Sequence, residues 1–263
     1  MVLGITTMKE DEIPTLTTLR SNSRLRNFIR KIPRLRETLY LLSELRTLLR
    51  YRPARARADT ARDYESRPDP WGYSTPWGTE HLRIVREILD RAVPNHFGSA
   101  LDVGCGEGWI TEAVASRCDC LLGVDIVSIA LDRAKDRCRS LPHVQFADWD
   151  LQRDPALGIF DLIILTGVME CFRSASEFRN ARDKIVGMLA PGSQLLVTTT
   201  HQSDAFDRAW WCRWLPRGGQ KIEEYLARGP YLEITDTVLS KTHRFTLYRR
   251  RIGLIDEASS ARK

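Results

Sequence analysis

Residues 99–115 read Ser-Ala-Leu-Asp-Val-Gly-Cys-Gly-Glu-Gly-Trp-Ile-Thr-Glu-Ala-Val-Ala. The apolar run at 100–103 predicts a short strand, which breaks into glycines at positions 104, 106 and 108. Apolar residues at 110, 114 and 115 follow at helical spacing. The order is therefore strand, glycine turn and helix, and a second apolar run then ends at Asp125.

This order has a chemical meaning at the turn. Glycine takes positive φ and lets backbone amides approach a ligand with no Cβ in the way, and the following helix directs free N–H groups to the same place. Asp125 lies 21 residues after Gly104, where an acid at the end of the next strand accepts hydrogen bonds from a ribose diol. We therefore expect a nucleoside site at the carboxyl edge of a parallel sheet. A structural turn is the alternative for the glycines alone. A nicotinamide-linked oxidoreductase is disfavoured because Trp109 replaces the third glycine of the dinucleotide motif.

The segment at 101–108 resembles the first motif of class I S-adenosylmethionine-dependent methyltransferases, and Asp125 matches the ribose-binding acid of that family. Residues 160–166 resemble its fourth strand, and residues 189–197 resemble its helix end and fifth strand. Within the class, the chain is most similar to the nodulation protein S type, which N-methylates a chitooligosaccharide precursor. The points of likeness are Asp69-Pro-Trp71, the glycine motif, Arg117-Cys-Asp119, Val124-Asp-Ile126 and Pro142-His-Val144, within a resemblance that covers about 68–250.

The resemblance implies S-adenosylmethionine as the cofactor. Asp148 ends the strand predicted at 143–147, and the resemblance assigns its position to the exocyclic amine of adenine. Trp149 follows with an aromatic ring able to cover the base. A turn-capping role for Asp148, or Asp150 as the adenine contact, stays open. The candidate cofactor-binding residues are Asp102, Gly104, Cys105, Gly106, Gly108, Asp125, Ile126, Asp148, Trp149 and Leu165.

Alternating strand and helix patterns predict an α/β, Rossmann-like three-layer sandwich. Its seven-stranded sheet is mostly parallel, with an antiparallel C-terminal hairpin strand, as the resemblance also implies. The predicted strands are 99–104, 120–125, 143–147, 160–166, 193–200, 232–239 and 243–250, and the predicted helices are 81–92, 108–117, 128–139 and 174–189. The predicted domains are a tail, basic amphipathic helical extension and linker at 1–60, a methyltransferase domain at 61–252 and a C-terminal tail at 253–263.

Two polar residues beyond the fifth strand are the candidate catalytic groups. His201 and Asp204 follow a strand end that lines the binding crevice of such a sheet, where they can take a proton from an acceptor. A polar loop histidine is the alternative for His201. We expect His243, at a late strand, to be structural.

Aromatic residues in irregular segments are the candidate substrate contacts. The segment at 64–80, rich in proline and glycine, is interpreted as a lid over the nucleoside, with packing on the sheet as the alternative. The long section at 202–230 is rich in tryptophan, which suits sugar or aromatic acceptors or packs on the core. The candidate substrate-contacting residues are Trp71, Glu170, Trp210, Trp211 and Tyr225.

The net charge of +6 is concentrated in one segment. Residues 20–57 hold eleven arginines and one lysine against two glutamates, so this segment carries +10. Three interpretations compete for its helical pattern: a helix packed on the domain, peripheral membrane contact through residues 20–57, and contact with an acidic partner. No transmembrane segment, no metal site and no nucleic-acid partner are expected. We expect a cytoplasmic protein with reduced cysteines.

These features together favour one function. We expect transfer of a methyl group from S-adenosylmethionine to an O or N nucleophile of a small molecule, with a sugar or glycan precursor as a candidate acceptor. The alternative is a non-catalytic methyltransferase-like protein that is recruited to a membrane or partner by its basic helix. Around Glu170 the chain departs from the nodulation protein S pattern, so the acceptor stays open.

Overall fold

The computed structural model describes residues 53–172, 174–200 and 219–252. These residues belong to one compact unit that starts at Arg52. The basic helical extension before it and the C-terminal tail at 253–263 lie outside the described residues, so both stay predictions. Within the described ranges, no helix combines the length and the hydropathy needed to cross a membrane.

A seven-stranded sheet forms the centre of this unit. Its strands are β1 (Phe97–Val103), β2 (Cys118–Asp125), β3 (Val144–Asp148), β4 (Phe160–Thr166), β5 (Leu189–Thr200), β6 (Leu232–Leu239) and β7 (His243–Arg250). They lie in the order β3-β2-β1-β4-β5-β7-β6. The first five strands pair in parallel, and β7 runs antiparallel to both β5 and β6. The predicted mostly parallel sheet with an antiparallel C-terminal hairpin is confirmed.

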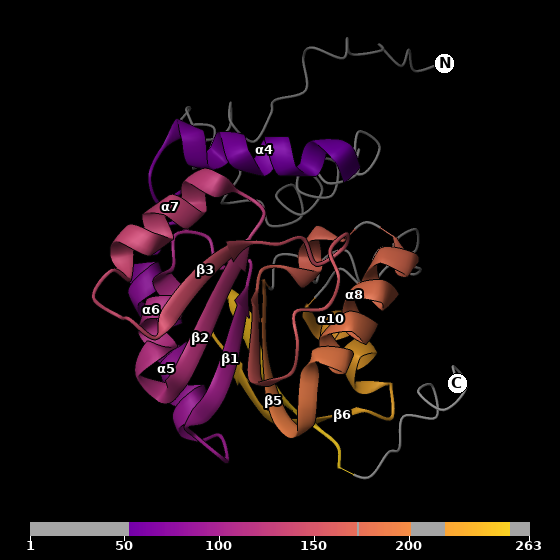
Figure 1. Cartoon of the computed structure of the whole chain (residues 1–263). Coiled ribbons are helices and arrows are strands. Elements are labelled where there is room, and N and C mark those ends of the chain that lie inside the picture. Colours follow the sequence, from indigo (N-terminus) through magenta and orange to yellow (C-terminus); the bar gives the residue numbers. More distant parts are fainter. Residues whose placement is uncertain (1–52, 173, 201–218, 253–263) are drawn as a thin grey trace, which may run out of the picture. The chain divides into compact units, whose positions relative to one another are not determined.

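Helices cover both faces of the sheet (Figure 1). They are α4 (Pro53–Ser66), α5 (Pro76–Asp90), α6 (Trp109–Val114), α7 (Ser128–Arg137), α8 (Ala175–Met188) and α10 (Gly219–Ala227), with short 3-10 turns at Ala115–Arg117 and Met169–Cys171. One hydrophobic cluster joins α5 and α6 to the sheet, and a second joins α8 and α10 to it. Because apolar side chains of both faces are buried in this way, the three-layer architecture is confirmed.

Two helix starts differ from the sequence-based prediction. The linker expected at 52–59 forms the beginning of α4, because alanine and arginine favour helix and Pro53 suits the first helical position, where no N–H is needed. Pro76 begins α5 for the same reason. The predicted start at His81 is therefore too late, because Pro76, which counts as a loop residue in the sequence, begins the helix.

The pairing places several strand ends at one edge of the sheet. The parallel strands β1, β2, β4 and β5 all finish there, and we call it the carboxyl edge. Since β7 is antiparallel, its first residue, His243, lies at the same edge, opposite Thr200 of β5. Ligands of open parallel sheets bind outside this edge.

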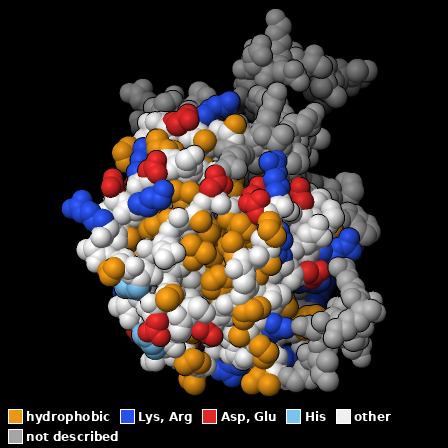
Figure 2. Space-filling model, in the orientation of Figure 1, with side chains coloured by type: hydrophobic (Ala, Val, Ile, Leu, Met, Phe, Trp, Pro, Cys, Tyr) orange, Lys and Arg blue, Asp and Glu red, His pale blue; other side chains and the backbone are white. Residues whose placement is uncertain are grey.

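Hydrophobic side chains gather at the centre of the face shown in Figure 2. The connection from β3 to β4 contains no helix in this described part of the chain. It leaves Leu157 and Ile159 37% and 60% exposed.

Candidate functional site

The turn after β1 depends on its glycines. Gly104, Gly106 and Gly108 have φ of 71°, 54° and 78°, a region that side chains with a Cβ rarely adopt. A Cβ on Gly104 would lie 2.6 Å from a methyl group of Val168, and one on Gly106 would lie 2.6 Å from the Tyr64 hydroxyl. The turn therefore sits in close contact with chain segments on both of its sides.

Asp125 joins this turn to the end of β2. One carboxylate oxygen accepts a hydrogen bond of 2.9 Å from the Gly106 N–H, and the other accepts one of 2.9 Å from the Val127 N–H. Burial raises the pKa of Asp125, and these two hydrogen bonds act in the opposite direction. Each carboxylate oxygen has a further lone pair, so Asp125 retains the capacity to accept from a diol.

Most backbone amides of the turn have partners within the chain. The N–H groups of Gly104 and Cys105 both donate to the Val124 carbonyl, and the Gly108 N–H donates to the Cys105 carbonyl. With the Gly106 amide held by Asp125, four amides that were expected to face a ligand are engaged internally. The tight turn therefore satisfies these donors itself, and the binding of the cofactor at the turn stays a prediction. The glycines instead allow the side chains of Val168 and Tyr64 to approach the turn closely.

Asp102 is a second buried carboxylate at this edge, at the end of β1. It is 1% exposed, and it accepts a hydrogen bond of 2.6 Å from the Thr111 hydroxyl of α6. Burial, with a smaller contribution from the charge of Asp125, raises the pKa of Asp102 to about 7. A cation bound nearby would therefore favour the ionised form.

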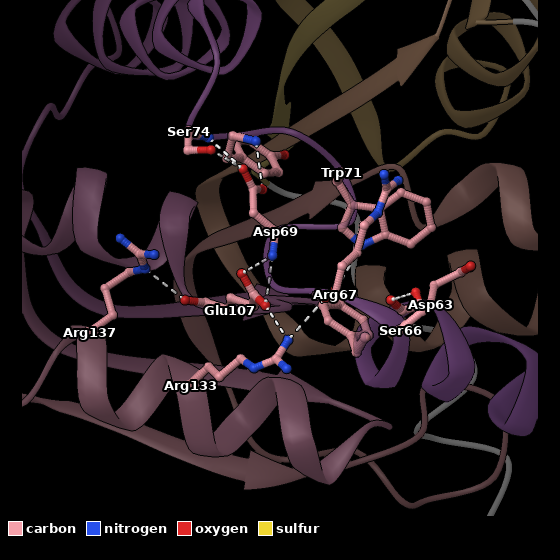
Figure 3. Close-up of polar contacts among 11 residues, drawn as sticks. Asp63, Ser66, Arg67, Asp69, Trp71, Ser74, Glu107, Arg133 and Arg137 are labelled. Atoms are coloured by element: carbon pink, nitrogen blue, oxygen red, sulfur yellow. Dashed lines mark hydrogen bonds and ion pairs between the residues drawn. The ribbon is translucent and has the colours of Figure 1, made fainter. Parts of the chain in front are cut away.

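A segment before α5 closes over the glycine turn, and we call residues 67–75 the strap (Figure 3). The Asp69 carboxylate accepts from the N–H groups of Tyr73 and Ser74 at 2.7 Å, which folds the strap on itself. The Asp69 N–H donates to both carboxylate oxygens of Glu107 at 3.0–3.1 Å. Glu107 also pairs with Arg133 of α7 at 2.7 Å. Glu107 thus connects the turn, the strap and α7, a role that its sequence position did not reveal.

Two aromatic residues complete this cover. Tyr64 of α4 is 3% exposed and its hydroxyl accepts a hydrogen bond of 2.8 Å from the indole N–H of Trp71 in the strap. Tyr64 also packs against Val127 and Ala130, immediately after Asp125. The lid interpretation of residues 64–80 stays a prediction, and the close approach of the Tyr64 hydroxyl to Gly106 supports it. Tyr64 itself was missed, because a single tyrosine in an expected loop carries no signal.

Other predicted cofactor residues lie at the same edge with differing surroundings. Asp148 is exposed and pairs in register with Asp125. Trp149 is 4% exposed, packs in the core with Leu165, and donates its indole N–H to the Pro155 carbonyl at 2.9 Å. The structure thus gives Trp149 a packing role, whereas its contact with adenine stays a prediction. Cys105 is buried and Ile126 half-buried beside the turn.

The predicted substrate and catalytic residues divide into three groups. Trp71 is 52% exposed in the strap. Glu170 accepts a hydrogen bond from the Thr200 N–H, which links the loop after β4 to the end of β5. Tyr225 packs against Phe178 of α8 with ring centroids 4.7 Å apart, so the structure places it in helix packing and its predicted substrate contact has no support there. The remaining four, His201, Asp204, Trp210 and Trp211, lie outside the described residues.

Comparison with known proteins agrees with this geometry. The family model of nodulation protein S (NodS) matches residues 54–213, which is more than half of the chain. The chain belongs to the nodulation protein S family. It is 32% identical to nodulation protein S of Rhizobium tropici over 137 residues, which cover 52% of this chain and 57% of that protein. A Mycobacterium tuberculosis protein named as an uncharacterized methyltransferase is 30% identical over 116 residues, covering 43% of this chain and 55% of the relative.

A solved NodS structure shares the fold. N-methyltransferase NodS from Bradyrhizobium japonicum WM9, in complex with S-adenosyl-l-homocysteine, aligns with a TM-score of 0.61 and 23% identity. The alignment covers 73% of this chain and 98% of that one. The two sequence alignments span 57% and 55% of the relatives. The family match therefore covers the domain that holds the glycine turn, Asp125 and the strap.

Proposed function

We propose that this NodS-family chain transfers the methyl group of S-adenosylmethionine to an oxygen or nitrogen atom of a small molecule. The observation that carries the proposal is the hydrogen bond from the Gly106 N–H to Asp125, at the carboxyl edge of the sheet. It brings the glycine turn and the acid that matches the ribose-binding residue of the family into one site. The SAH complex of the solved NodS structure supports the choice of cofactor.

The residues present fit the cofactor in charge and in hydrogen-bonding capacity. Asp125 would hold the ribose hydroxyls with its remaining lone pairs, and Asp102 would stabilise a positive charge nearby. Tyr64 and the strap would exclude water from the bound nucleoside. The cofactor supplies an electrophilic methyl group on a good leaving group, so the chain has to align and desolvate the acceptor, which contributes several kcal/mol in such reactions.

The proposal also includes the chemical class of the methyl acceptor. We select amino sugars of the glycan-precursor type as the first class to test, because the resemblance to the nodulation protein S type implies them. The test is transfer of radioactive methyl from S-adenosylmethionine to a panel of de-N-acetylated chitooligosaccharides, hydroxylated aromatics and small amines. Labelled product from any acceptor supports the proposed methyl transfer, and labelled amino sugars support the proposed acceptor class. Binding of S-adenosylhomocysteine without transfer to any acceptor would instead favour a non-catalytic binding protein.

A further inference from the structure

Unpaired polar atoms gather on one side of the carboxyl edge. Seven buried side-chain nitrogen or oxygen atoms lack a hydrogen-bond partner among the described residues, and four of them belong to His81, Thr166 and Thr198. Folded proteins pair nearly all such atoms, so a concentration of exceptions calls for an explanation. None of these three residues was selected from the sequence as a site residue.

The pairing of strands shows that the three residues share a face. Thr166 ends β4 and lies opposite Thr198 of β5, which lies opposite Phe245 of β7. The ring of Phe245 contacts the ring of His81 at a centroid distance of 4.7 Å. His81 belongs to the first turns of α5. All three polar side chains therefore lie on the α5 face, next to the carboxyl edge.

His81 is held in an aromatic enclosure. Its ring centroid lies 5.1–5.5 Å from those of Tyr73, Trp77 and His243. Trp77 is fixed in turn, because its indole N–H donates to the Thr242 hydroxyl at 3.0 Å. Burial, and to a lesser extent His243, lowers the pKa of His81 to about 3. His81 is therefore a neutral imidazole with one donor and one acceptor nitrogen.

Tyr73 of the strap lies between this enclosure and the glycine-turn site. The ring of Tyr73 stacks on Trp109, the first residue of α6, with centroids 6.3 Å apart. Burial raises the pKa of Tyr73, and the charge of Asp102 raises it further. Its N–H is held by Asp69 at 2.7 Å. Tyr73 therefore separates His81 from the site that we assign to the cofactor, and the strap would have to move for a ligand to reach His81.

We propose that His81, Thr166 and Thr198 form the subsite that binds the methyl-accepting group, an amine or hydroxyl on a ring that packs against Tyr73 and Trp77. The acceptor N–H or O–H donates to the unprotonated nitrogen of His81, and the two threonine hydroxyls hold a neighbouring hydroxyl of the same ring. The hydrogen bonds orient the lone pair of the nucleophile. In the transfer a C–N or C–O bond forms to the methyl carbon as its C–S bond to the donor breaks, and the proton of the methylated group is released to solvent and not to His81, whose pKa is about 3. Aromatic walls with few polar groups are typical of small-molecule sites. This inference rests on the proposed function.

The test uses the full-length chain with the panel member that wild type methylates fastest. His81→Phe keeps the ring volume and removes both nitrogens, and we expect kcat/KM for the acceptor to fall about tenfold or more, since the acceptor loses a partner in a buried site. Thr198→Val should also lower kcat/KM for the acceptor. In the double variant the fold-reduction of kcat/KM should be smaller than the product of the two single fold-reductions, because both residues hold the same ligand. His81→Gln, which retains an acceptor and a donor, should recover part of the loss.

The controls separate this inference from the proposed function. Thr246→Val removes a buried hydroxyl on the opposite face of β7 that bonds to Glu223 at 2.6 Å, and it should leave the acceptor KM unchanged. S-adenosylhomocysteine affinity should be unchanged in every variant. Unaltered acceptor kinetics in His81→Phe and Thr198→Val, with wild-type turnover intact, would overturn the subsite and leave the proposed function standing. Absence of turnover by wild type with every panel member would refute the proposed function, and the subsite with it.

Discussion

The glycine-turn site and the His81 subsite lie at the same edge of the sheet, but their polar atoms differ in how they are satisfied. Around the turn, Asp125, Glu107 and Asp69 each accept two or more hydrogen bonds from other parts of the chain. Around His81, the imidazole and two threonine hydroxyls have no partner among the residues described. The polar groups of the first region are already hydrogen-bonded within the chain, whereas those of the second region can still form hydrogen bonds with a ligand. This difference fits a preorganised cofactor site at the glycine turn and an acceptor site around His81 whose hydrogen bonds are completed by the ligand.

The largest expected effect comes from breaking the organised region with Gly106→Ala. The new Cβ meets the Tyr64 hydroxyl, and φ of 54° is strained for alanine, so the variant should lose about 1–3 kcal/mol of stability or more. Chemical denaturation measures the change. The matched control is Gly187→Ala in α8, where a Cβ meets nothing within 4 Å, and helix propensity should stabilise that variant by about 0.5–1 kcal/mol. Equal effects in the two variants would contradict the assigned role of the turn.

The unpaired region should show itself in the pH dependence of stability. The pKa of His81 is about 3 in the folded chain, against an ordinary value of 6.5. The unfolded chain therefore binds a proton first, and stability falls as pH drops below 6.5. One pKa unit corresponds to about 1.4 kcal/mol, so wild type should lose about 2 kcal/mol between pH 6.5 and 5 from this residue. His81→Phe should lack that contribution. Parallel stability curves for wild type and His81→Phe would contradict the burial of a neutral His81.

The strap should loosen when its shared partner is altered. Glu107→Gln removes the charge that pairs with Arg133 and weakens acceptance from the Asp69 N–H, which should cost about 1–3 kcal/mol because Glu107 is buried. Thermal unfolding and proteolysis within residues 67–75 measure the effect. Asp132→Asn, which breaks the exposed pair with Lys135, should change little. If both variants behave alike, Glu107 does not hold the strap.

The smallest effect concerns Asp102. Its pKa of about 7 lies above the ordinary value of 3.8, so its contribution to stability is complete at low pH and is lost as pH rises through 7. A cationic ligand favours the ionised form. The affinity ratio of S-adenosylmethionine to neutral S-adenosylhomocysteine should therefore rise several-fold between pH 6 and 8. Asp102→Asn should abolish the rise, and a ratio independent of pH in wild type would exclude this role.

The comparison also shows what the sequence could predict. Strong local patterns gave the sheet: the strands at 160–166, 232–239 and 243–250 match the structure at both ends, and the contact of Asp125 with the turn follows from spacing and strand order. No helix is predicted over 53–66, where the structure has α4, because residues 52–59 read as a linker. Glu107, Tyr64 and His81 were missed because their roles arise from contacts between segments distant in sequence, which no local pattern encodes.

The central claim is that the glycine turn and Asp125 together bind the nucleoside of the cofactor. Calorimetric titration of the full-length chain with S-adenosylhomocysteine, in wild type and in Asp125→Ala, tests it most directly. We predict binding to wild type, and affinity at least about tenfold weaker in the variant, because hydrogen bonds to a charged group contribute about 1.5–3 kcal/mol. Absence of binding to wild type, or equal affinity in both proteins, would contradict it.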